Sequence, residues 1–141
     1  MEDEQVSFSA RAEELGLGSG WTWDKGSWWR AAEAGFEVRG YTAKMLQAGA
    51  RFVTITATET KDGTMRFDYQ WDLQGQLLSL SIEAVDGKIA TITDLCPAAD
   101  WVERETREYF AMEFTGRPSM EPLMLRAGNE LGLHLRKEEK A

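Results

Sequence analysis

Apolar and polar residues alternate through the middle of the chain, which is the pattern of β-strands with one buried face. Four runs carry this pattern or are rich in β-branched residues: residues 52–56, 65–72, 78–84 and 89–93. Three dipeptides that suit tight hairpin turns separate these runs: Asp62-Gly63, Gln74-Gly75 and Asp86-Gly87. We therefore predict an α+β fold with a four-strand antiparallel meander over about residues 51–93, whose apolar face must be covered.

Two segments beside these strands have the pattern of helices and are the predicted covers. The first, residues 41–48, contains good helix formers and is bracketed by glycines. The second, residues 97–112, begins with a proline, which suits a first helical position, and Asp94 or Cys96 precedes it as a candidate cap. No helix-breaking residue interrupts the second segment, so it is predicted as one continuous helix.

One residue conflicts with the apolar stripe of this second helix. At 3.6 residues per turn, the stripe and expected core face consist of Ala98, Trp101, Val102, Tyr109 and Met112. Glu105 falls in its middle, and a carboxylate buried without a partner is costly, so we expect it to be paired, protonated or covered. Glu103 with Arg107, and Arg104 with Glu108, are predicted to be surface ion pairs, each worth about 0.2–0.5 kcal/mol.

The chain divides into three predicted parts: an N-terminal segment at 1–40, an α+β domain at 41–126 and a polar tail at 127–141. Residues 16–20 are glycine-rich, but their spacing does not fit a phosphate-binding loop, so we interpret them as a flexible connection. Four tryptophans follow: Trp21, Trp23, Trp28 and Trp29. They either pack against the core, which we favour, or form a surface for a partner. The tail is expected to be disordered on its own.

Composition and charge exclude several classes of function. The chain has 141 residues, of which 43% are hydrophobic, and a formal net charge of −8. This acidity argues against binding to nucleic acid or to anionic membranes, both of which need a basic patch. The single cysteine excludes an internal disulfide and an iron–sulfur cluster held by this chain alone. An acidic N-terminus and the lack of a long apolar run predict a cytoplasmic chain that does not insert into a membrane.

No group of residues predicts catalysis, cofactor binding or metal binding. His134, the only histidine, lies in the polar tail without neighbouring ligands, and Cys96 lacks a nearby base. Glu103, Glu105 and Glu108 could form an acid–base site, but two arginines lie among them. We therefore favour structural or interface pairing for these glutamates, since ion-pair networks perturb carboxylates as readily as active sites do.

The second helix and the residues after it resemble the signature of a known family. The motif consists of Pro97-Ala98-Ala99-Asp100-Trp101, Glu103-Arg104-Glu105, Glu108-Tyr109-Phe110, Phe114, Gly116, Pro118 and Leu123-Met124-Leu125. It resembles the 30-kilodalton subunit family of respiratory complex I (the C subunit of NADH–quinone oxidoreductase), together with the related small subunits of energy-converting membrane-bound hydrogenases. Three positions depart from the family pattern. Ala111 stands where a glycine is usual, Arg117 where histidine or lysine is usual, and Glu121-Pro122 where a basic pair is common.

The resemblance implies a cofactor-free accessory subunit of the hydrophilic arm. Such a subunit docks on the large subunit that carries the quinone site or the nickel–iron site, near iron–sulfur subunits, and stays peripheral to the inner membrane. The short chain and the departures favour an energy-converting [NiFe] hydrogenase as host, with NADH–quinone oxidoreductase itself as the alternative. The residues predicted to contact the large subunit are Glu103, Arg104, Glu105, Glu108, Arg117, Pro118, Leu123 and Leu125.

Two functions of other classes compete with this prediction. Size, acidity and α+β composition also suit a free-standing acidic binding module, such as a dimeric secretion chaperone. A small cofactor-free hydrolase or isomerase would use Glu105 with a raised pKa at the base of a closed pocket.

Overall fold

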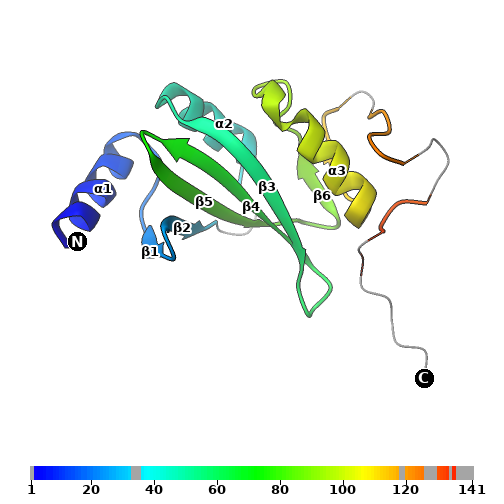
Figure 1. Cartoon of the computed structure of the whole chain (residues 1–141), viewed down its shortest axis with the longest axis horizontal. Helices are drawn as coiled ribbons and strands as arrows, with labels where there is room; N and C mark the ends of the chain where they lie inside the picture. Colours follow the sequence, from blue (N-terminus) through cyan, green and yellow to red (C-terminus); the bar gives the residue numbers. More distant parts are fainter. Residues whose placement is uncertain (1, 33–35, 118–119, 126–129, 134, 136–141) are drawn as a thin grey trace.

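A computed structural model of the chain describes residues 2–32, 36–117, 120–125, 130–133 and 135, and the side chains from residue 8 onward. Its elements, in order, are α1 (Glu2–Glu14), β1 (Thr22–Asp24), β2 (Ser27–Ala31), α2 (Val38–Gln47), β3 (Arg51–Glu59), β4 (Met65–Leu73), β5 (Gln76–Glu83), β6 (Lys88–Ala90), a 3-10 turn η1 (Pro97–Ala99), α3 (Asp100–Phe110) and β7 (Glu113–Thr115). Figure 1 shows these elements along the chain. Among the described residues, every helix is too short or too polar to span a bilayer.

The main sheet has five strands in the order β1-β2-β5-β4-β3. Strands β3, β4 and β5 form the predicted antiparallel meander, with Tyr69 of β4 between Ile55 of β3 and Leu80 of β5. The alternation read from the sequence is confirmed, because Phe67, Tyr69 and Trp71 are all at most 1% exposed. The turn at Gln74-Gly75 has positive φ at both residues, as a tight two-residue hairpin requires. The α+β fold class is therefore confirmed.

The predicted fourth strand of the meander is wrong in its position. Residues 88–90 form β6, which leaves the sheet and pairs in parallel with β7. The edge of β5 is occupied instead by β2, which runs parallel to it with Trp28 beside Leu78. Because this edge is already paired, the chain after β5 cannot add a further strand there, and β6 finds its partner beyond α3.

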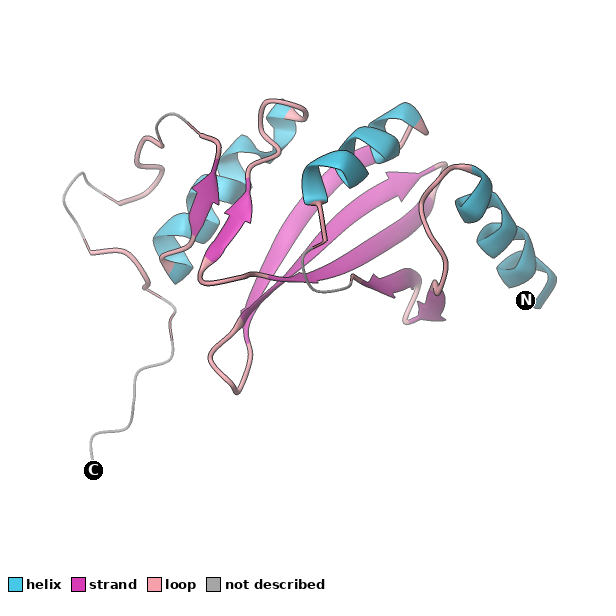
Figure 2. Cartoon of the chain, turned by 180° about the vertical axis from the view of Figure 1, so that it is seen from behind, coloured by secondary structure: helices cyan, strands magenta, loops and turns pink. Residues whose placement is uncertain are grey.

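The apolar face of the sheet is covered by helices, as expected. Helix α2 adds Val38, Tyr41 and Met45 to the core and lies in front of the sheet in Figure 2. It begins three residues before the predicted segment and includes Gly40. Helix α3 and the β6–β7 pair lie beyond β3 in both views, and η1 and α3 contact that strand. The predicted helix at 97–112 is thus present as η1 followed by α3, and it ends at Phe110, two residues before the predicted end.

The residues before α2 share the sheet with the rest of the chain. Trp21 and Trp28 are buried, and Phe8 of α1 stacks on Trp28 with ring centroids 4.2 Å apart. These contacts agree with the favoured interpretation that the tryptophans pack. Trp23 differs, since it is 41% exposed.

Candidate functional site

The predicted core face of α3 is only partly buried: Met112 lies in the core and Val102 packs against it, but the face around Trp101 points outward. Trp101 is 70% exposed and Glu105 is also exposed, whereas Glu103, Thr106 and Glu108 are the buried residues of the helix. The predicted burial of Glu105 is therefore wrong. The reason is that the inner side of α3 meets backbone N–H groups, hydroxyls and an arginine, for which a carboxylate is a better neighbour than an indole.

Glu103 is the centre of a buried polar cluster. Its side chain is fully buried and accepts hydrogen bonds from the Thr91 hydroxyl (2.5 Å), the Ile92 backbone N–H (2.9 Å) and the Thr93 hydroxyl (2.9 Å). Arg117 adds an ion pair at 3.3 Å. Four donors thus compensate one buried charge, which removes most of the desolvation cost. The predicted surface pair between Glu103 and Arg107 is not formed.

Two arginines extend this cluster to neighbouring segments. Arg117 donates a 2.6 Å hydrogen bond to Asp100, and this contact holds the pKa of the Asp100 carboxyl below its usual value. Arg39 of α2 binds both carboxylate oxygens of Asp94 at 2.6 and 2.7 Å and also reaches the Thr91 carbonyl. The hydrogen bond from Arg39 lowers the pKa of Asp94 to about 2. The loop after β6 is therefore tied to α2, to α3 and to the residues after β7.

Glu108 holds a segment that follows β7. Its carboxylate is 1% exposed and accepts the backbone N–H groups of Leu123 (2.6 Å), Met124 (2.9 Å) and Leu125 (2.9 Å). Burial favours the neutral acid, but these three donors together keep the pKa of Glu108 below its usual value. Arg104 fixes the same segment through the carbonyls of the two residues before Leu123 and pairs with Asp100 at 3.4 Å. We call residues 121–125 the strap.

The predicted contact residues thus have different surroundings. Four of them are engaged within the chain: Glu103, Arg104, Glu108 and Arg117. Leu123 and Leu125 are half-buried in the strap, and Glu105 is exposed. Pro118, like His134, lies outside the described residues.

Sequence reasoning missed the threonines of the cluster. Thr91 and Thr93 are separated from Glu103 by ten residues or more, and their only sequence signal is that they follow an apolar strand. Within the described residues, no three His, Cys, Asp or Glu side chains gather in a way that could hold a metal ion. The arrangement that is present joins α2, the loop after β6, α3, Arg117 and the strap through four carboxylates and three arginines. These hydrogen bonds and ion pairs hold α3 and the strap in a fixed relative position.

Comparison with known families tests the resemblance to the 30-kilodalton subunit family that the sequence motif indicates. The profile described as "Respiratory-chain NADH dehydrogenase, 30 Kd subunit" matches residues 37–141, about three-quarters of the chain. The chain belongs to this family. The matched part contains the Glu103 cluster, α3 and the strap, and it leaves out α1, β1 and β2. Three of the signature residues, Glu103, Arg104 and Glu108, are thus among those that hold the helix and the strap in place.

The curated relatives are named as C or C/D subunits of NADH-quinone oxidoreductase. The chain is 33% identical over 91 residues to the NADH-quinone oxidoreductase C subunit of Ruegeria pomeroyi, covering 61% of this chain and 45% of that protein. It is 31% identical over 85 residues to the C subunit of Rhodobacter capsulatus, covering 55% and 43%. It is also 39% identical over 49 residues to the NADH-quinone oxidoreductase C/D subunit of Cronobacter sakazakii, covering 35% and 8%. The chain spans less than half the length of these relatives.

A solved structure shares the fold. The trypsin-resistant fragment (1-134) of Nqo5 aligns with a TM-score of 0.60 at 18% identity, covering 84% of this chain and 99% of the fragment. At this identity the likeness concerns the fold alone. It covers more of the chain than the family profile does.

Proposed function

We propose that this chain is a cofactor-free accessory subunit of NADH–quinone oxidoreductase, in the place of its C subunit. The observation that carries the proposal is the family match across residues 37–141, joined to relatives that are named as C or C/D subunits of that enzyme. In this role the chain docks on the large subunit of the hydrophilic arm, near its iron–sulfur subunits. It stays on the cytoplasmic side and reaches the inner membrane only through the complex.

The geometry supports a structural role for the signature residues within this subunit. Glu103, Glu108 and Arg117 fix α3 and the strap from inside, so we propose that they shape the docking surface. Glu105 and the strap leucines remain available for direct contact. The hydrolase or isomerase alternative loses its premise, because Glu105 is exposed on the outer side of α3. The secretion-chaperone alternative is disfavoured by the family match.

The hydrogenase host favoured by the sequence remains a second candidate on one observation. Ala111, Arg117 and Glu121-Pro122 depart from the usual pattern of the family, which suits a divergent branch. The names of the curated relatives nevertheless support the quinone oxidoreductase better.

Affinity purification of the tagged chain from membranes of its own host tests the proposal. We expect the other subunits of NADH–quinone oxidoreductase to co-purify, and deletion of the chain to reduce NADH:quinone activity until the wild-type chain is restored. Co-purification of a nickel–iron large subunit would instead establish the hydrogenase host. A chain recovered alone or as a homodimer, with unchanged NADH:quinone activity after deletion, would contradict both.

A further inference from the structure

Helix α3 has a face that neither the sheet nor the strap covers. Successive residues of an α-helix turn by about 100°, so positions 101, 105 and 109 form one stripe. The neighbouring positions 104 and 108 bind the strap, and positions 103 and 106 face the Glu103 cluster and the core. On the stripe between them, Trp101 and Glu105 are exposed and Tyr109 is half-buried. It contains Trp101 and Tyr109, two of the residues that the apolar pattern assigned to the core.

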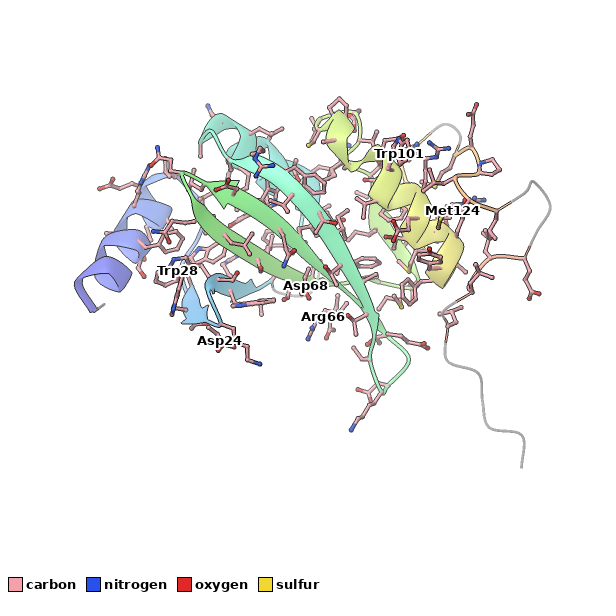
Figure 3. The ribbon with its side chains drawn as sticks, in the orientation of Figure 1. Asp24, Trp28, Arg66, Asp68, Trp101 and Met124 are labelled. Carbon is pink, nitrogen blue, oxygen red and sulfur yellow. The ribbon has the colours of Figure 1, made fainter. Side chains whose placement is uncertain are left out.

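Large apolar side chains are concentrated on this face. Trp101 is 70% exposed and Met124 of the strap is 56% exposed. Tyr109 joins them, since its hydroxyl lies 3.7 Å from the Met124 sulfur. Figure 3 shows Trp101 and Met124 along α3, on the side away from β3. Tryptophan and methionine are both enriched at protein interfaces, because each buries much apolar area with few polar demands.

The charge at the centre of this face is a carboxylate. Glu105 lies one turn from Trp101 on the same stripe and forms no ion pair with any residue of the described ranges. The nearby cations are engaged elsewhere, since Arg104 pairs with Asp100 and binds the strap, and Arg117 pairs with Asp100 and Glu103. A surface that buries this face therefore has to supply hydrogen-bond donors to Glu105, and a lysine or arginine supplies both the donors and the opposite charge.

We propose that the face formed by Trp101, Glu105, Tyr109 and Met124 is the surface on which another subunit of the complex docks. The partner presents an apolar pocket for the Trp101 indole and a lysine or arginine to Glu105. A second copy of this chain packed through the same face would bring a second carboxylate instead of a cation. An anionic membrane would repel a chain of net charge −8. This inference rests on the proposed function and names the contact within it.

Site-specific photo-crosslinking in the assembled complex tests this surface. A photo-reactive amino acid replaces Trp101 or Glu105 in the full chain in its host, with exposed Glu14 of α1 as the matched control position. We expect positions 101 and 105 to give crosslinked adducts with another subunit of the same complex. Position 14 should give no adduct with that subunit. Adducts with a second copy of the chain, or no adducts from either position, would overturn the inference.

Substitution provides an independent readout. Trp101→Ala and Glu105→Lys should each reduce recovery of the partner subunits at least about tenfold, the effect expected of an interface hot spot. Trp23→Ala and Glu14→Lys change an exposed tryptophan and an exposed glutamate elsewhere and should leave recovery unchanged. Thermal unfolding of each purified chain shows whether the variant is folded. Full recovery with folded Trp101→Ala and Glu105→Lys chains would overturn the inference but leave the proposed function intact. Failure of the wild-type chain to recover any subunit would instead contradict the proposed function.

Discussion

Glu103 and Glu105 lie two residues apart on one helix and have opposite environments. Glu103 is fully buried among four donors, whereas Glu105 is exposed. A buried carboxylate contributes to stability only while its donors are in place, because each donor would otherwise be left without an acceptor. The two residues therefore form a matched pair for experiment.

Glu103→Gln should lower the free energy of unfolding by about 2–4 kcal/mol. The amide keeps the shape but removes the charge that balances Arg117, and its NH2 group cannot accept the bonds now donated to that oxygen. Glu105→Gln should change the free energy by less than about 0.5 kcal/mol, as at other exposed positions. Urea unfolding followed by circular dichroism measures both. Equal effects of the two substitutions would show that the Glu103 cluster does not hold α3.

Ala111 ends α3 in the left-handed region, with φ of 54°. An L-residue with a Cβ is strained there, and glycine is the residue that helices ordinarily use at this position. Ala111→Gly should therefore raise the free energy of unfolding by about 0.5–1 kcal/mol, the relieved strain exceeding the added entropy of the unfolded chain. Ala43→Gly in the exposed part of α2 is the control and should lower it by about as much. Thermal unfolding of both variants decides the sign.

At the scale of elements, α3 is held between the β6 loop and the strap by two buried glutamates on different sides. Glu103 faces the loop after β6 and Glu108 faces the strap. Each carboxylate accepts backbone N–H groups, so side chains of the helix hold both segments. The expected i,i+4 ion pairs of Glu103 and Glu108 are replaced by hydrogen bonds to residues more than ten positions away in the sequence. Arg104 does keep an ion-pair partner on its own helix, but that partner is Asp100.

Protonation of Glu108 should release the strap. The pKa of Glu108 is lower in the folded chain than its ordinary value of 4.5. Its contribution is therefore fully present above about pH 4.5 and is lost as the pH falls through the lower folded pKa. NMR amide shifts of Leu123, Met124 and Leu125 should titrate together in that acidic range.

Glu108→Gln should abolish this titration and leave the strap amides weakly protected from hydrogen exchange at neutral pH. Glu121→Gln, an exposed change within the strap, should leave the titration in place. Strap amides that remain protected in Glu108→Gln would show that Arg104 and the one remaining acceptor oxygen are sufficient to hold the strap.

At the scale of the whole molecule, the sheet continues into the segment before α2. Strand β2 pairs with β5, and α1 packs on β2 through Phe8 and Trp28. These contacts predict that residues before α2 unfold together with the rest, although the family profile starts only at residue 37.

Phe8→Ala should lower the unfolding free energy of the whole chain by about 3 kcal/mol, since it removes a buried ring from a stacked pair. Hydrogen exchange of the β4 amides reports the effect far from the site of substitution. The control, Glu14→Ala, should change those rates little. If Phe8→Ala left β4 protection unchanged, the N-terminal segment would be a separate unit, as the sequence division at residue 40 suggests.

The sequence by itself determined what depends on neighbouring residues. The alternation of residues 65–72, the Gln74-Gly75 turn and the helix after Pro97 follow from local pattern and turn chemistry, and the signature motif identifies the family. Only the tertiary structure decided which side of α3 is buried, which strand pairs with β5, and where β6 goes. The buried side of α3 depends on hydrogen-bond donors far away in the chain, such as Thr91 and Arg117. The place of β6 depends on β2, which already pairs with β5. An apolar stripe therefore predicts burial only when the opposite side lacks partners that can compensate a charge.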